Sequence, residues 1–308
     1  MTEPLVTIFT PVYNHENYLD EYFESIIKQT YENIELIIID DASTDQSVKV
    51  IEKWLPMIED RFVKFSYIPR NENKGLIYNC NEGVDLARGK YMYLFASDDI
   101  MLPTNVEEKV NYLEKNPQYS LVYSDGYIQY ENSEITFSSI YKLLFRRKFS
   151  NTTKHYFGNV KNEVFIKNFI RAATVCIRRE CIINVGKYST KYSLEDNYMW
   201  IKLSQIYEFG FINKPLVKYR VHNKSLSHSE KNLEKLNSSL FRMIEDFSKE
   251  GNYEQFVIEK AYKNYYGIRA LQSYKNSNYE SFNYFYEKSE KVVGLKLRKI
   301  LITLKRKL

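Results

Sequence analysis

The sequence predicts an α/β protein in which a mostly parallel central sheet is flanked by helices and followed by a helical C-terminal extension. Two observations support this prediction. Over the first hundred residues, short β-branched apolar runs alternate with amphipathic segments, a pattern typical of parallel sheets covered on both faces. From residue 231 to about residue 290 the pattern is helical, with many charged and aromatic side chains.

The strands of the first hundred residues are predicted from runs that are too short and too β-branched for helices. These runs span residues 5–13, 34–40, 62–68 and 90–97. The segments between them have helical periodicity and span residues 15–29, 43–56 and 73–89. In the second of these helices, Ser43 and Thr44 are suited to cap the N-terminus, and Pro56 is expected to end the helix.

Beyond residue 100 we expect a helix over 104–120 and then a strand over 121–125. A strand and a helix ended by Gly186 follow over 173–188. The last expected elements are a helix with an acidic start over 194–210 and an extended segment over 211–227. No linker is long enough to separate independently folded parts. We therefore expect one domain over residues 1–227 and a helical extension over residues 228–308.

The composition indicates a folded soluble protein, since 44% of the residues are hydrophobic and 27% are charged. A formal net charge of +5 is too mild to indicate nucleic-acid binding. Three cysteines without a CxxC spacing argue against a disulfide scaffold and a zinc site. Neither a signal peptide nor a run of roughly 20 apolar residues is recognisable. The expected location is therefore the cytoplasm.

Polar residues follow the apolar part of three predicted strands: Tyr13 after the first, Asp40 and Asp41 after the second, and Asp98 and Asp99 after the fourth. Because the carboxyl ends of parallel strands meet at one edge of the sheet, these side chains are expected to lie together. A cluster of carboxylates needs a compensating cation, and oxygen ligands suit Mg²⁺ or Mn²⁺. The sequence therefore predicts a divalent metal at this edge.

Several motifs in order resemble family 2 glycosyltransferases, which are inverting enzymes with the Rossmann-like GT-A fold. The resemblance covers roughly residues 5–227 and rests on the segments TIFTPVYNHENYLDEYFESIIKQTYENIELIIIDDASTDQS (7–47), NKGLIYNCNEG (73–83), ASDD (96–99), LEDNYMW (194–200) and KYRVHNKSLS (218–227). It implies a nucleotide-binding half up to about residue 125 and an acceptor-binding half over about residues 126–227.

The resemblance also implies roles for the donor-binding positions. Pro11 and Tyr13 would line the nucleobase pocket, and Asp41 would accept a hydrogen bond from the base, as a carboxylate can from a uracil N–H. Asp98 and Asp99 would contact the ribose and a divalent metal, Mn²⁺ or Mg²⁺, that bridges the two phosphates of a nucleotide-sugar, with a UDP-sugar expected.

Three further positions complete the implied site. His222 would reach the metal or the pyrophosphate. Asp196 would be the general base that takes the proton from the acceptor hydroxyl, and Glu195 would support it or be the base in its place. A single catalytic carboxylate is sufficient for inversion, because no covalent intermediate is formed.

The last stretch, residues 294–308, has six basic side chains, no acidic one, and leucines and isoleucines on one helical face. Such a helix binds a membrane surface or packs on its own domain, and both interpretations remain open here. If this helix is a membrane anchor, the resemblance implies a bacterial enzyme on the inner face of the membrane. It would extend a capsule, O-antigen or similar surface glycan on an undecaprenyl-diphosphate-linked acceptor.

Two other functions remain as alternatives. Many family members have Asp where this chain has Ala96 and Arg where it has Cys80, so a catalytically silent nucleotide-sugar or glycan-binding relative is one alternative. A nucleotidyltransferase is the other, but it would need a glycine-rich basic loop after the first strand. The segment TPVYNHEN contains no Gly, Lys or Arg.

Overall fold

The computed structural model describes residues 3–131, 136–137, 139–140, 157–222, 230–250, 253–275 and 278–290. These residues divide into two compact units. The larger unit draws on Met1–Val160, Phe169–Lys191 and Glu195–Ser229, and the smaller one on Lys161–Asn168, Tyr192–Leu194 and Glu230–Leu308. Short internal segments around residues 165 and 193 thus belong with the C-terminal helices.

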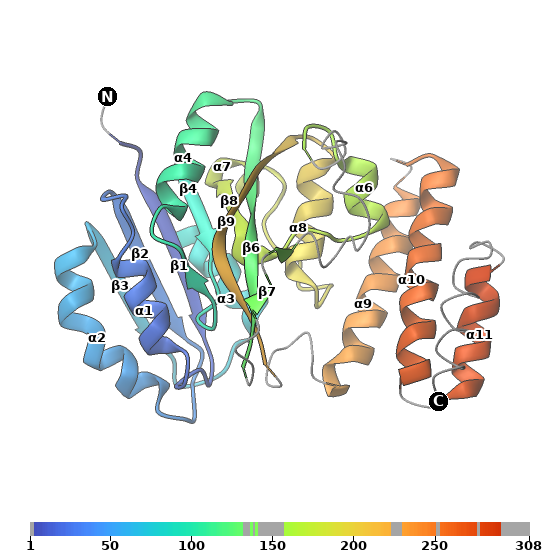
Figure 1. The fold of residues 1–308 in the computed structure, drawn as a ribbon, viewed down its shortest axis with the longest axis horizontal. Helices are drawn as coiled ribbons and strands as arrows, with labels where there is room; N and C mark the ends of the chain where they lie inside the picture. Colours follow the sequence, from blue (N-terminus) through green and yellow to red (C-terminus); the bar gives the residue numbers. More distant parts are fainter. Residues whose placement is uncertain are drawn as a thin grey trace. The chain divides into compact units, whose positions relative to one another are not determined.

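The larger unit is built on one curled sheet (Figure 1). Its strands are β1 (Val6–Val12), β2 (Ile34–Asp40), β3 (Lys64–Pro69), β4 (Tyr91–Leu94), β5 (Ile100–Met101), β6 (Tyr119–Tyr130), β7 (Thr136–Phe137), β8 (Val175–Arg178) and β9 (Glu208–Val221). They are ordered β3-β2-β1-β4-β8-β6-β9-β5, with β7 beside β6.

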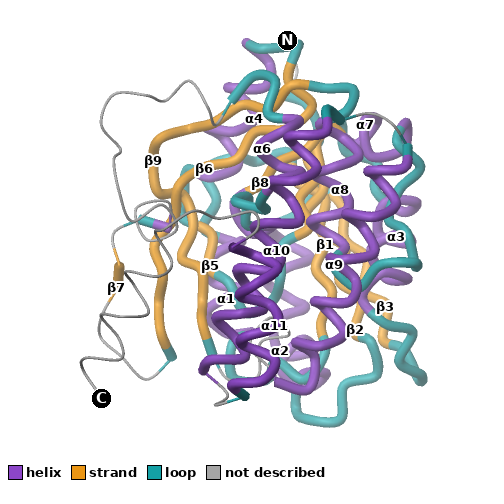
Figure 2. Tube along the Cα trace, turned by 90° about the vertical axis from the view of Figure 1, so that its right-hand side faces the viewer, coloured by secondary structure: helices purple, strands orange, loops and turns teal. Residues whose placement is uncertain are grey.

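The first four strands in this order pair in parallel, as the alternation predicted. Strand β8 then pairs antiparallel with both β4 and β6. Beyond it, β6 and β9 run side by side in parallel (Figure 2). The parallel pairing of β1 with β2 and β4 confirms that the ends of these three strands share one edge.

Helices cover both faces of this sheet. They are α1 (Leu19–Ile27), α2 (Ser47–Arg61), α3 (Leu76–Leu86), α4 (Asn105–Lys115), α7 (Arg179–Asn184) and α8 (Glu195–Ser204). On β1, the Thr10 hydroxyl is hydrogen-bonded to Tyr22 of α1, whereas the ring of Phe9 lies against Gly83 of α3. Because side chains alternate along a strand, these two contacts place α1 and α3 on opposite faces.

Helix α2 corrects one expectation from the sequence: Pro56 does not end it, because the helix continues to Arg61. The buried side chains of Trp54 and Ile58 lie on either side of the proline. Their packing outweighs the loss of one helical hydrogen bond. The predicted cap is also wrong, since Gln46 is the N-cap residue and makes no side-chain cap.

The start of the sheet is fixed by a buried carboxylate. Glu35 is 5% exposed and accepts hydrogen bonds from the Thr7 hydroxyl at 2.6 Å and the Arg88 amide at 2.8 Å. The Gly89 amide donates in turn to the Thr7 hydroxyl at 2.9 Å. A Cβ atom at Gly89 would lie 2.5 Å from the Thr7 backbone nitrogen, so only glycine allows this approach.

We expect Gly89→Ala to destabilise the larger unit by about 2–3 kcal/mol, since the added methyl group forces the backbones apart. The control is Gly267→Ala, where an added Cβ meets nothing within 4 Å and the helix gains about 0.5–1 kcal/mol. Urea denaturation monitored by circular dichroism measures both. Equal midpoints for Gly89→Ala and the wild type would contradict this reading.

The smaller unit is helical and comprises α6 (Lys161–Ile166), α9 (Glu230–Lys249), α10 (Gln255–Lys275) and α11 (Tyr279–Glu290). Its packing is rich in aromatic side chains, for example the Phe165 and Tyr253 rings, stacked 4.0 Å apart. Within the described ranges, none of the helices has the length and apolar character needed to cross a membrane. The predicted amphipathic tail, residues 294–308, lies outside the described residues.

Candidate functional site

The chain turns sharply where β1 and β2 end. Asn14 has a φ of 56° and Ala42 a φ of 62°, in the left-handed region that non-glycine residues rarely adopt. The two turns are joined, because the Asn14 amide donates to the Ser43 hydroxyl at 2.9 Å and the Thr44 amide to the Asn14 side chain at 2.7 Å. Strained turns of this kind gather at functional sites.

Pro11 and Tyr13 are the two predicted nucleobase contacts. Tyr13 follows β1, is 46% exposed and presents its ring at the edge where the parallel strands end. Pro11 lies within the strand, and its carbonyl accepts a 3.4 Å hydrogen bond from the Ser97 hydroxyl. A second exposed ring, Tyr78, lies beside the Arg70 guanidinium, 5.1 Å from the ring centre. The edge therefore offers aromatic faces on which a base can stack.

Asp41 is buried, and both of its carboxylate oxygens hold the loop before α3. They accept hydrogen bonds from the amides of Lys74 at 2.8 Å and Gly75 at 2.9 Å. Gly75 has a φ of 86°, which brings the loop back towards the carboxylate. Asp40 accepts similarly from the amide and hydroxyl of Ser43. Each carboxylate oxygen has a second lone pair, so Asp41 keeps acceptor capacity for a ligand.

The two carboxylates after β4 occupy different environments. Asp98 is partly exposed, and a 2.9 Å hydrogen bond joins its Oδ2 to Nε2 of His222. Asp99 is 3% exposed, and its Oδ1 accepts the Arg220 amide at 2.9 Å. The loop after β4 is therefore tied at two points to the end of β9, which brings His222 to the predicted site.

The environments separate the charges of the pair. Burial and the adjacent Asp98 carboxylate raise the pKa of Asp99 well above its usual value. Burial also opposes the charge of Asp98, but the hydrogen bond from His222 and the charges of His15 and His222 outweigh it and lower the pKa of Asp98. The pKa values of the two carboxyls therefore shift in opposite directions, and Asp98 is the one that ionises more readily.

Sequence reasoning missed four members of this cluster, which are His15, Tyr18, Ser97 and Glu131. Nδ1 of His15 is hydrogen-bonded to the Ser97 hydroxyl at 2.7 Å. The ring of Tyr18 lies 4.5 Å from that of His222, and its hydroxyl donates to Glu131 at 2.6 Å. For His15 the available signal was the polar run NHEN directly after the first strand, at the edge where ligands bind.

The cluster is not a preformed metal site. No three His, Cys, Asp or Glu side chains converge as metal ligands within the described parts of the chain. Nδ1 of His222 is nevertheless buried without a hydrogen-bond partner among the described residues. An ionised carboxylate next to an imidazole fits a divalent cation that takes its remaining ligands from substrate phosphates and water.

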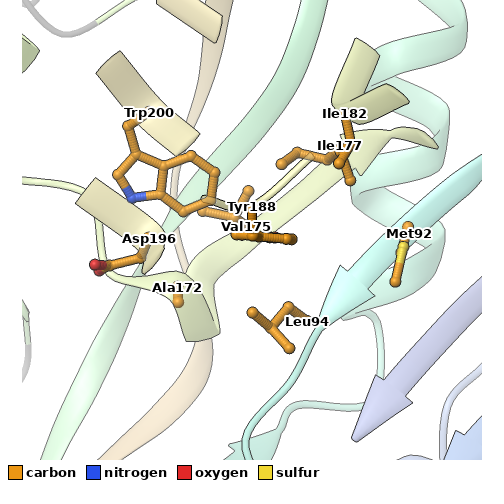
Figure 3. Close-up of a pocket in the computed structure, with 9 residues that line it drawn as sticks. All are labelled: Met92, Leu94, Ala172, Val175, Ile177, Ile182, Tyr188, Asp196 and Trp200. Atoms are coloured by element: carbon orange, nitrogen blue, oxygen red, sulfur yellow. The ribbon is translucent and has the colours of Figure 1, made fainter. Parts of the chain in front are cut away.

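A second group of polar side chains begins α8. Asp196 lines a pocket on the face of the sheet opposite α1, and its Oδ1 accepts the Asn197 amide at 2.6 Å. Figure 3 shows it beside Trp200, across the pocket from Leu94. Burial and the Asp196 charge raise the pKa of the preceding Glu195 to about 8. Asp196 thus meets the pocket next to a neighbour that holds a proton at neutral pH.

A pH dependence of stability follows from the Glu195 shift. Its ordinary pKa is 4.5 and its folded pKa about 8, so the folded chain binds the more protons between these values. Stability from this group is therefore full below about pH 4.5 and is lost as the pH rises towards about 8. We expect Glu195→Gln to flatten the fall of the urea midpoint between about pH 6 and about pH 8; an unchanged slope would refute the shift.

Comparisons with known proteins agree on one family. The family model described as Glycosyl transferase family 2 matches residues 7–181. An uncharacterised glycosyltransferase of Methanocaldococcus jannaschii is 30% identical over 227 residues, 73% of this chain and 73% of that protein. One of Haemophilus influenzae is 31% identical over 232 residues, 73% of this chain and 68% of that protein.

Solved structures show the same fold at low sequence identity. A mannosyltransferase from Pyrobaculum calidifontis, in complex with GDP-Man and Mn²⁺, superposes with a TM-score of 0.66 at 15% identity, covering 99% of this chain and 80% of that one. S. aureus TarS 1–349 with UDP-GlcNAc superposes with a TM-score of 0.56 at 14% identity, covering 93% and 92%. These likenesses confirm the predicted GT-A fold.

Proposed function

Because the chain belongs to glycosyl transferase family 2, we propose that it transfers a sugar from a UDP-sugar donor to a hydroxyl of a glycan or lipid-linked glycan, inverting the anomeric centre. The observation that supports this best is the ionised Asp98, held by His222 at the strand edge that carries Tyr13 and Asp41. The diphosphate and the nucleobase of the donor would both bind at this edge.

Donor binding would use the groups at the strand ends. Tyr13 would stack on the nucleobase, beside Pro11, and a free lone pair of Asp41 would accept the base N–H. Asp98 would hold Mn²⁺ or Mg²⁺ together with the diphosphate, with His222 next to it; Asp99 would reach the cation only with the oxygen that does not accept the Arg220 amide. The cation would stabilise the charge that builds up on the departing diphosphate.

The chemical step would depend on Asp196. Its carboxylate would take the proton of the acceptor hydroxyl while that oxygen attacks the anomeric carbon from the side opposite the diphosphate. Glu195 suits a supporting role better, because a group with a pKa of about 8 is mostly protonated at neutral pH and is a weak acceptor there. Its proton keeps a second negative charge away from Asp196.

Calorimetric titration with UDP, with and without Mn²⁺, tests the donor assignment first. Binding that requires Mn²⁺ is the expected result, and a panel of UDP-sugars with radiolabelled sugar would then report transfer to glycan or polyprenyl-linked acceptors. Binding of GDP in place of UDP would indicate a GDP-sugar donor and would leave the family assignment unchanged. Absence of binding by any nucleotide would indicate a silent relative.

The acceptor proposal is a surface polysaccharide, such as a capsule or O-antigen, built on a lipid carrier. It is supported by the basic, amphipathic pattern of residues 294–308. We expect the full chain to sediment with vesicles containing anionic lipid, and a chain ending at residue 293 to remain in the supernatant. Equal sedimentation of both, or none with either, would refute a membrane anchor in this tail.

A further inference from the structure

The imidazole of His222 lacks the hydrogen bond that usually orients a histidine beside a metal. Its side chain is fully buried, and its Nε2 lies 2.9 Å from Oδ2 of Asp98. Its Nδ1 is buried without a hydrogen-bond partner among the described residues. A histidine that ligates a metal almost always donates its second ring N–H to a carboxylate, a carbonyl or a water, and this bond fixes the ring. At His222 the ring must therefore be held by its packing.

Tyr18 provides this packing. Its ring centre lies 4.5 Å from that of His222, with an angle of 32° between the two planes, so it covers a face of the imidazole. His15 meets both rings edge-on, at 5.7 Å from Tyr18 and 6.2 Å from His222. A rotation of the imidazole about its side-chain bond would therefore drive it into the tyrosine ring.

Tyr18 is itself held at its ring and at its hydroxyl. The hydroxyl donates to Glu131 at 2.6 Å, and the Arg220 guanidinium lies 5.3 Å from the ring centre. Glu131 follows β6, and its amide donates at 3.2 Å to the carbonyl of Val221, the last residue of β9. Tyr18, just before α1, thus contacts side chains from the paired ends of both strands.

We propose that Tyr18 is a positioning residue that keeps the imidazole of His222 directed at Asp98, and that Glu131 fixes Tyr18 through its hydroxyl. The inference rests on the proposed function, because it concerns the histidine that would lie beside the cation. Tyr18 acts through His222 and Glu131 acts through Tyr18. A stacked ring restricts the imidazole without using either ring nitrogen, so Nε2 stays directed at the carboxylate while Nδ1 has no partner.

The orientation of His222 is tested first in the full-length protein without metal. The chain has four histidines, and His222→Gln assigns the ring signals of His222 in an NMR spectrum. Asp98→Asn should shift these signals, because it removes the charge that the imidazole contacts. In a Tyr18→Leu background we expect Asp98→Asn to shift them no longer, since the ring is then free to turn away.

The affinity for Mn²⁺ in the presence of UDP, measured by the electron paramagnetic resonance of free Mn²⁺, is the second readout. Tyr18→Leu should weaken Mn²⁺ binding by about 10–100-fold, the usual effect of losing a group that orients a ligand. Calorimetric binding of UDP without metal should stay unchanged. Tyr18→Phe keeps the stacked ring and loses the bond to Glu131, so we expect a smaller loss of about two- to tenfold, the effect of one hydrogen bond.

Glu131→Ala should weaken Mn²⁺ binding as much as Tyr18→Phe does. The variant with both changes should lose no more than either alone, because the two groups form one hydrogen bond. Tyr31→Phe is the matched control: Tyr31 is as buried as Tyr18, and its hydroxyl also donates, here to the Pro4 carbonyl. It lies where the parallel strands begin, so its loss should leave both readouts unchanged.

The outcomes separate this inference from the proposed function. If Asp98→Asn still shifts the His222 signals in the Tyr18→Leu background, the inference is overturned and the function stands. If the wild type binds no Mn²⁺, the metal assignment fails, and the His222 signals still decide whether Tyr18 orients the ring. Equal losses of UDP binding with and without Mn²⁺ would show a merely structural role and overturn it.

Tyr18→Phe and Glu131→Ala keep the test decisive if Tyr18→Leu does not fold, because neither removes the stacked ring. Equal losses of Mn²⁺ affinity that do not add in the double variant support the inference. No loss in either variant, or losses that add, would overturn the role of Glu131 and of the Tyr18 hydroxyl.

Discussion

Replacing Asp196 with Asn is expected to lower the rate of sugar transfer by about 10²–10⁴-fold, the usual contribution of a positioned general base, while donor binding is unchanged. The amide keeps the size of the side chain and loses the ability to take a proton. Single-turnover transfer measures the chemical step, and calorimetry with UDP and Mn²⁺ measures binding. The residue lines a pocket and is not part of the strand edge that would bind the nucleotide.

Glu195→Gln is the matched control for that experiment. Because Glu195 is held largely protonated, glutamine resembles its native state, and we expect the transfer rate at about pH 7 to fall by less than about tenfold. The reverse ranking, with Glu195→Gln the more damaging change, would make Glu195 the base. Loss of UDP binding in Asp196→Asn would contradict the role given to Asp196.

Asp98→Asn is expected to remove the Mn²⁺-dependent part of UDP binding, with a loss of about 100-fold or more in metal affinity. The reason is charge: the hydrogen bond from His222 lowers the pKa of Asp98 and keeps this carboxylate ionised at neutral pH. Titration of UDP at several Mn²⁺ concentrations measures the coupling between nucleotide and cation. In the variant the affinity for UDP should no longer depend on Mn²⁺.

The comparison variant is Asp99→Asn. Burial and the Asp98 carboxylate raise the pKa of Asp99 well above its usual value, so Asp99 carries its charge less readily than Asp98, and Oδ1 of an asparagine can still accept the Arg220 amide. We expect Mn²⁺ dependence to persist in Asp99→Asn and to vanish in the double variant. A greater loss in Asp99→Asn than in Asp98→Asn would show that Asp99 is the principal ligand.

Much of the nucleotide-binding half follows from local sequence. The run 34–40, for example, has four isoleucines in seven residues, which favours a strand. The alternation of such runs with amphipathic helices predicts a parallel sheet. Parallel pairing alone then brings Tyr13, Asp41 and Asp98 to one edge. The family motifs, which are contiguous stretches, added Asp196 and His222.

Other features depend on contacts between distant segments. Pro56 marks a helix end in isolation, yet α2 continues because the burial of Trp54 and Ile58 outweighs one hydrogen bond. The pKa values of Asp98 and Asp99 shift in opposite directions because burial raises that of Asp99, whereas His222, more than a hundred residues away, lowers that of Asp98. No local pattern reports such partners, since burial and hydrogen bonds set a pKa and both are tertiary properties.

The sequence by itself determined the fold class, the edge of the sheet where chemistry gathers, and the residues that the family motifs name. Only the tertiary structure decided that the pKa values of Asp98 and Asp99 shift apart, how Asp41 holds the loop before α3, and that Trp200 lines a small pocket against β4 and β8. Antiparallel insertion of β8 beside β4 brings Ile177 next to Met92 from 85 positions away. Periodicity shows which face of a strand is apolar, whereas the strand that pairs with it is selected by the packing of the whole sheet.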